Sequence, residues 1–255
     1  MLVSAVIRSS DRSTPSTASI SSDGWSLSKS PDCATKTAAC GSCMNWRDVG
    51  VDMGNRYLDE FFSLRCSADV LQACAPVNNG AQEITEAMGM RRVLKDIVLA
   101  PGNKCKYHVL DLCAGNGLFG LVAVHTLPVR TVTAIDIRPR KFRLEQVQRY
   151  QYLFRDIYDD VPVIDPSIVC GIHACRGLAL RITDIYLNSP NAKKLILMPC
   201  CECGTMPTRH QVILDRIPAP LRWVWYLADH VDGNIIHDNH ILSARNYIIV
   251  AEKLL

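Results

Sequence analysis

A carboxylate and two glycines stand close together in residues 107–120, which read Y-H-V-L-D-L-C-A-G-N-G-L-F-G. The apolar run before Asp111 predicts a strand, Gly115 and Gly117 predict a turn, and the apolar residues from Leu118 onward predict a helix. Glycine lets the backbone approach a ligand closely, and the first turn of a helix offers unpaired N–H donors. This stretch therefore predicts a site for a nucleotide cofactor.

Two kinds of nucleotide cofactor fit this pattern. Gly115, Gly117 and Gly120 satisfy the G-x-G-x-x-G pattern of dinucleotide-binding proteins, and Asp136 follows at a suitable distance. The position of Asp111 favours another cofactor, because a carboxylate between strand and glycines would repel a pyrophosphate. The same carboxylate suits the cationic ammonium and sulfonium of S-adenosylmethionine, and Asp136 suits its ribose diol. An NAD-dependent oxidoreductase is the alternative.

A histidine and several cysteines follow two later apolar runs of the chain. His173 and Cys175 follow one run, and Cys200 and Cys201 follow the next. Ligands of a doubly wound α/β sheet bind at the carboxyl ends of the strands, so we expect all four side chains in one catalytic pocket. His173 would act there as a general base, or the four would bind zinc. Adjacent cysteines point to opposite faces of an extended chain, which favours a pocket without metal.

The elements that must position these residues alternate between strands and helices. Strands are predicted at residues 107–112, 132–135, 152–154, 168–172, 195–198, 234–241 and 246–252. Helices are predicted from residue 118 and at residues 140–150, 177–187, 211–217 and 221–230. This alternation predicts an α/β fold with a mostly parallel sheet, an antiparallel last strand and helices on both faces.

Composition divides the chain into three predicted parts. Residues 1–31 are rich in Ser and Thr and predict a disordered tail. Residues 32–100 predict a helical extension that contains cysteines, because apolar residues stand at helical spacing in 45–75 and 81–99. We expect the segment 45–75 to cover the cofactor site. Cys40 and Cys43 form a C-x-x-C pair there, but the irregular spacing of the other cysteines disfavours a zinc module. Residues 101–255 form the predicted cofactor-binding domain.

The overall composition limits the protein's surroundings. The chain has 255 residues, of which 48% are hydrophobic, enough for one sizeable core. Its formal charge of +3 neither demands nor excludes a nucleic-acid partner. We expect no membrane span, because no apolar run is long enough. The chain has twelve cysteines and shows no signal-peptide pattern, which predicts an intracellular, cytoplasmic protein. The alternative is an organelle transit peptide in the tail.

From about residue 90 to its end, the chain resembles the class I S-adenosylmethionine-dependent methyltransferases. D-L-C-A-G-N-G is similar to their first motif, T-V-T-A-I-D to the second, F-R-D-I to the third, and N-Y-I-I-V-A-E-K to their last strand. The resemblance implies a Rossmann-like methyltransferase sheet with S-adenosyl-L-methionine as cofactor. The cofactor-binding residues that it implies are Asp111, Ala114, Gly115, Gly117, Asp136, Ile137, Asp156 and Ile157.

The H-x-C and P-C-C motifs resemble a subgroup of that family. This subgroup includes eukaryotic tRNA 2′-O-ribose methyltransferases and several methyltransferase-like proteins, which implies RNA (a tRNA ribose) or protein as methyl acceptor. The subgroup's pattern is H-x-C-G, whereas this chain has Arg176 in place of the glycine. A methyltransferase-like subunit without activity is a further alternative, which the intact Asp111 and Asp136 disfavour. A basic cluster at residues 138–143 predicts either a phosphate contact or a solvated helix start.

Overall fold

The structure is a computed structural model that describes residues 54–139, 147–201 and 217–253, all of which belong to one unit. The predictions made for residues 1–53, for residues 140–146 and for most of the segment 211–217 lie outside the described residues. Within these residues, no helix is both long and apolar enough to cross a membrane.

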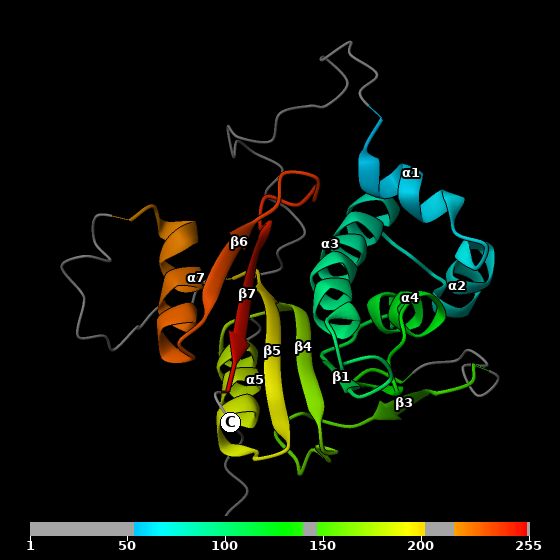
Figure 1. Cartoon of the computed structure of the whole chain (residues 1–255). Helices are drawn as coiled ribbons and strands as arrows, with labels where there is room; N and C mark the ends of the chain where they lie inside the picture. The colour runs from blue at the N-terminus through cyan, green and yellow to red at the C-terminus, as the bar shows by residue number, and fades with distance from the viewer. Residues whose placement is uncertain (1–53, 140–146, 202–216, 254–255) are drawn as a thin grey trace, which may run out of the picture. The chain divides into compact units, whose positions relative to one another are not determined.

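A seven-stranded sheet forms the centre of this unit, in the order β3-β2-β1-β4-β5-β7-β6 (Figure 1). The strands are β1 (His108–Leu112), β2 (Thr131–Asp136), β3 (Tyr150–Phe154), β4 (Ser167–Ala174), β5 (Ala192–Pro199), β6 (Asn234–His237) and β7 (Tyr247–Glu252). The pairs from β3 through to β5 are parallel, and β7 is antiparallel to both of its neighbours, β5 and β6.

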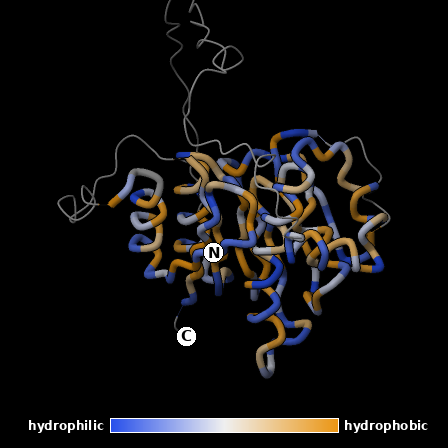
Figure 2. The backbone as a smooth tube through the Cα atoms, turned by 90° about the horizontal axis from the view of Figure 1, so that it is seen from above, coloured by the Kyte–Doolittle hydropathy of each residue, from blue (hydrophilic) through white to orange (hydrophobic). Residues whose placement is uncertain are grey.

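Two layers of helices cover the two faces of the sheet (Figure 1). The first layer contains α1 (Arg56–Ser63), α2 (Ser67–Cys74), α3 (Gly80–Leu99) and α4 (Leu118–Thr126), and the second contains α5 (Gly177–Asn188) and α7 (Ala219–His230). The residues of β1 are all buried, as expected for a central parallel strand that is covered on both sides. Hydrophobic residues recur along the strands and helices (Figure 2).

The long helix α3 lies in close contact with the connection between β6 and β7. A side chain on Gly89 would meet Ile241, since a Cβ there would lie 2.5 Å from its Cδ1 atom. Tyr57 of α1 donates a hydrogen bond of 2.5 Å to the buried carboxylate of Asp238 in the same connection. The backbone N–H of Ile241 donates to the Asp238 carbonyl, which makes a turn. The predicted strand at 234–241 is therefore too long, and β6 ends at His237.

The sheet order and strand directions are those of a Rossmann-like methyltransferase fold, which confirms the predicted fold class. All seven predicted strands are present, within a few residues of their predicted ends. The helix predicted at 140–150 is wrong at its end, because Tyr150 begins β3 and pairs with Val132 of β2. The helices α1 to α3 share one hydrophobic cluster with β1, β2 and α4.

Candidate cofactor and catalytic site

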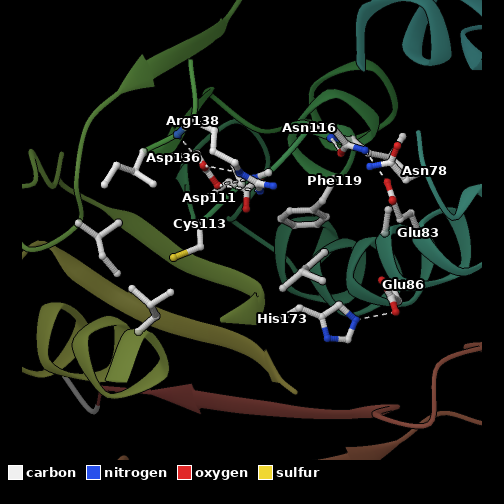
Figure 3. A pocket seen from close by; sticks show the side chains of 18 of the residues that line it. Asn78, Glu83, Glu86, Asp111, Cys113, Asn116, Phe119, Asp136, Arg138 and His173 are labelled. Atoms are coloured by element: carbon white, nitrogen blue, oxygen red, sulfur yellow. Dashed lines mark hydrogen bonds and ion pairs between the residues drawn. The ribbon is translucent and has the colours of Figure 1, made fainter. Parts of the chain in front are cut away.

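A cavity of about 700 Å³ opens at the carboxyl ends of β1, β2 and β4 (Figure 3). This is the end of the sheet where doubly wound folds bind their ligands, next to the point where the strand order reverses between β1 and β4. The helix α3 forms the opposite wall with Glu83 and Glu86, and the segment before it adds Pro76 and Asn78. None of the cavity-lining residues belongs to α1 or α2, the described helices of the segment 45–75 that is predicted to cover the cofactor site.

Seven of the eight residues predicted to bind the cofactor line this cavity. They are Asp111, Ala114, Gly115, Asp136, Ile137, Asp156 and Ile157. The eighth, Gly117, precedes α4 and has a φ of 77°, a left-handed conformation that favours glycine. A Cβ at Gly117 would also collide with the hydroxyl of Tyr150. Gly117 therefore shapes the turn that places its neighbours at the cavity.

The carboxylate of Asp111 is buried at the base of the cavity, with only 2% of the residue exposed. Its Oδ2 atom has no hydrogen-bond partner among the described residues. Burial raises the pKa of Asp111 to about 7, the nearby Asp136 raises it further, and the Gly120 backbone N–H lowers it. An unpaired buried acceptor is costly, so this atom suits a ligand that brings a cation or a donor. The ammonium group of S-adenosylmethionine has both properties.

Asp136 lies at the end of β2, and both of its oxygens already accept hydrogen bonds. The backbone N–H of Gly115 donates to Oδ2 at 2.8 Å, which holds the glycine turn against β2. Arg138 donates to Oδ1 from its backbone nitrogen at 2.9 Å and from Nε at 3.0 Å. The Arg138 side chain is 70% exposed, whereas that of Asp136 is 6% exposed. A ribose diol that bonds to Asp136 would therefore displace the arginine side chain.

His173 reaches the cavity from an irregular part of β4. The register of β4 with β5 shifts between Ile172 and Ala174, and His173 has a φ of 53°. A bulge of this kind turns a side chain out of the regular alternation of a strand. The His173 Nε2 atom lies 2.5 Å from Oε1 of Glu86 on α3, which is close enough for an ion pair (Figure 3). The angles of this contact do not meet hydrogen-bond geometry. Gln82 donates to the same carboxylate oxygen at 2.8 Å.

The three predicted cysteines form a cluster that does not line the cavity. Cys175 Sγ lies 2.8 Å from Cys200 Sγ and 3.4 Å from Cys201 Sγ, and the last two are 3.4 Å apart. The chain turns after β5 ends at Pro199, so the expectation that adjacent cysteines point apart is wrong. The structure also separates the predicted set of four, because the His173 side chain faces Glu86 and the thiols face one another.

The thiols of this cluster differ in their acidity. Burial raises the pKa of Cys175 and that of Cys200. The pKa of Cys201 is lowered, because the thiols of Cys200 and Cys175 donate to it and the guanidinium groups of Arg245 and Arg176 add positive charge. Cys201 is therefore the member of the cluster that most readily becomes a thiolate.

Sequence reasoning missed the residues that α3 brings to the cavity. Glu83 and Glu86 stand three positions apart, a spacing that puts them on the same face of a helix. That spacing was a usable signal, but their partners lie far away in the chain. Asn116 donates from Nδ2 to Oε2 of Glu83 at 2.5 Å, and its Oδ1 accepts from the backbone of Leu118 at 3.1 Å. Asn116 thus connects the glycine turn to α3.

Comparison with known proteins gives matches only among solved structures. No family model and no curated protein matches the chain. The 23S rRNA methyltransferase ErmE is 15% identical, with 64% of this chain and 67% of that chain covered and a TM-score of 0.43. The CMeT domain of the citrinin polyketide synthase is 13% identical, with 77% and 60% covered and a TM-score of 0.46. Magnesium protoporphyrin IX methyltransferase (ChlM) from Synechocystis PCC 6803, with bound SAH, is 14% identical, with 76% and 95% covered and a TM-score of 0.42.

These matches add nothing about the substrate of the chain. All three TM-scores lie below 0.5, and the chain spans only 60% of the length of the polyketide synthase domain. The chain has a methyltransferase fold. That statement rests on the strand order, on the single antiparallel strand among the seven described, and on the cavity at the carboxyl ends of the parallel strands.

Proposed function

We propose that the protein is an S-adenosylmethionine-dependent methyltransferase. The observation that carries this proposal is the pair of carboxylates at the ends of β1 and β2, which border one cavity on either side of the glycine turn. Asp111 has a buried oxygen without a partner in the described part of the chain, and it would hold the cationic end of the cofactor. Asp136 would bind the ribose, and a pyrophosphate would face the unfavourable charge of Asp111.

The remaining predicted residues would hold the adenine. Ile137, Asp156 and Ile157 lie beyond Asp136 along the same cavity, and they combine apolar surface with one carboxylate that accepts hydrogen bonds. When bound, the cofactor supplies a methyl group activated by a sulfonium. The protein then has to align the acceptor with that group and exclude water, which accounts for a large part of such catalysis.

His173 is the proposed general base of the reaction. Its ring borders the cavity, and the buried carboxylate of Glu86 lies against Nε2, where it would orient the ring. In the proposed transfer the acceptor atom bonds to the methyl carbon, the carbon–sulfur bond breaks, and the acceptor's proton goes to His173. A hydroxyl acceptor needs such help most, and we therefore propose an RNA ribose as acceptor, with a protein side chain as the second candidate.

Calorimetric titration with S-adenosylhomocysteine and with NAD tests the cofactor assignment. We expect S-adenosylhomocysteine to bind, and Asp136→Ala to weaken its binding by about 1–3 kcal/mol, the typical loss of hydrogen bonds to a charged group. Asp165→Asn is the matched control, because this exposed carboxylate pairs with Lys193 away from the cavity. Binding of NAD without binding of S-adenosylhomocysteine would reverse the assignment.

Transfer of a labelled methyl group identifies the acceptor. The full chain and cofactor are incubated with RNA, protein and small-molecule fractions of the native cell extract. We expect label in the RNA fraction, which should be sensitive to ribonuclease. Label in the protein fraction would overturn the proposed acceptor but not the proposed reaction. Cofactor binding without label in any fraction would favour a subunit that binds the cofactor and has no activity of its own.

A further inference from the structure

The cysteine cluster at the carboxyl ends of β4 and β5 has the composition and the spacing of a metal site. The Sγ atoms of Cys175, Cys200 and Cys201 all lie within 4.8 Å of one another, and no other described residues form a comparable group of ligand atoms. Thiolate sulfur is a preferred ligand of zinc. We propose that these three cysteines bind one zinc ion.

The distances between the sulfur atoms fit a single ion. Zinc binds thiolates at about 2.3 Å, so two ligands of a tetrahedral site stand about 3.8 Å apart. The three observed separations are 2.8, 3.4 and 3.4 Å, and binding would widen them by about 0.4 to 1.0 Å. The cysteines of a [4Fe–4S] cluster each bind a different iron, so their sulfur atoms stand farther apart than those around a single ion. A mononuclear site is therefore the better fit.

The backbone brings the three ligands together in advance. The β4 bulge at His173 and the positive φ of 50° at Arg176 turn the chain on either side of Cys175. The backbone N–H of Arg176 donates to the carbonyl of Cys201 at 3.4 Å, which connects the two strand ends. Because the cluster is already assembled, an ion that binds there has little ordering of the chain to bring about.

The surroundings fit the charge of the proposed site. Three thiolates and one Zn²⁺ carry a net charge of −1, and the positive charges of Arg176 and Arg245 act on Cys201. The His173 side chain is directed to Glu86, and the described residues offer no fourth ligand. Zinc sites with thiolate ligands are four-coordinate, so one further group completes the proposed site.

Metal analysis of the full chain tests the proposal without using methyl transfer. The protein is purified under reducing conditions, and its zinc content is measured together with the absorption spectrum after replacement by Co²⁺. We expect the chain with Cys175, Cys200 and Cys201 all changed to Ser to bind about one zinc ion fewer than the wild type. We also expect it to lose the thiolate-to-cobalt charge-transfer band. If the triple variant does not fold, the single variant Cys201→Ser replaces it, because Cys201 is the most exposed of the three cysteines.

A second triple variant separates this site from the other candidate cysteines of the chain. Cys33, Cys40 and Cys43 lie outside the described residues, and changing all three to Ser should leave the zinc of the proposed site in place. Equal zinc in the wild type and in the variants of the β4–β5 cluster would overturn the proposal. So would mass-spectrometric detection of a disulfide between Cys175 and Cys200 as the prevailing form of the freshly purified protein. If the variants of the β4–β5 cluster lose the zinc, the metal site is supported even where methyl transfer has not been demonstrated.

Discussion

At the scale of single residues, Asp111 is the side chain with the most unusual surroundings. It is a carboxylate at the end of a fully buried strand, and its pKa is raised to about 7. Near neutral pH it is therefore partly protonated in the protein without ligand. A bound cation would favour the ionised form, so cofactor binding and proton release should be coupled.

We expect S-adenosylhomocysteine to bind more tightly at pH 7.5 than at pH 5.5. Asp111 must release its proton to attract the ammonium group. Because far more of it is ionised at pH 7.5 than at pH 5.5, the dissociation constant should differ roughly tenfold between the two pH values. Calorimetry at the two pH values measures it. Asp111→Asn, which keeps the shape but has no charge, should bind weakly with little pH dependence. The same pH dependence in both proteins would show that another group is responsible.

Arg138 is the second residue whose role can be tested directly. Its exposed side chain bonds to Asp136 and would compete with a ribose there. An exposed ion pair contributes about 0.2–1 kcal/mol, so Arg138→Ala should tighten S-adenosylhomocysteine binding by at most about fivefold. Arg130→Ala, another exposed arginine that does not line this cavity, is the control. Weaker binding by Arg138→Ala would mean that the arginine contacts the cofactor.

At the scale of elements, the site is assembled by a helix and an irregular strand. The strand β4 carries His173 on its bulge, and α3 carries Glu86 on the face that it turns to the cavity. A regular β4 would alternate its side chains strictly, and a register change of one residue would reverse their directions. The position of the proposed base therefore depends on the bulge and on the packing of α3 against the sheet.

We expect His173→Ala to lower kcat by about 10²–10⁴-fold and to leave the affinity for S-adenosylhomocysteine unchanged. The reason is that a general base acts on the acceptor's proton and not on the cofactor. Glu86→Gln should lower kcat less than His173→Ala does, since it changes only the group that orients the ring. Single-turnover rates with the labelled acceptor and calorimetry measure the two quantities. A parallel loss of cofactor affinity in His173→Ala would assign the histidine to cofactor binding.

At the scale of the whole molecule, the ionisation of Asp111 links the cavity to stability. Its pKa is raised in the folded protein above the unfolded value of 3.8, so the folded state binds more protons between about pH 4 and pH 7. The stability from this group is fully present below the unfolded pKa and is lost as the pH rises through the folded pKa.

We therefore expect the free energy of unfolding of the wild type to fall relative to that of Asp111→Asn as the pH rises from 4 to 7. The upper limit is on the order of 4 kcal/mol, which follows from the difference between the two pKa values. Denaturant unfolding at several pH values measures it, and the difference should level off above pH 7. A constant difference between the two proteins would show that Asp111 does not titrate in this range.

The sequence by itself determined the local structure and the position of the candidate cofactor site. Apolar runs, a glycine turn and a carboxylate after each of two strands are local signals, because the preferences of the backbone and the period of side-chain burial act over a few residues. They were sufficient for the alternation of strands and helices and for Asp111 and Asp136 at one cavity.

Only the tertiary structure decided which side chains meet. Glu86 faces His173, Arg138 covers Asp136, and three sulfur atoms converge without the histidine. Each of these contacts depends on a bulge, a turn or the packing of a helix, and a shift of one residue would remove it. Local patterns do not contain that information, because it arises from the way distant segments pack together in a dense core.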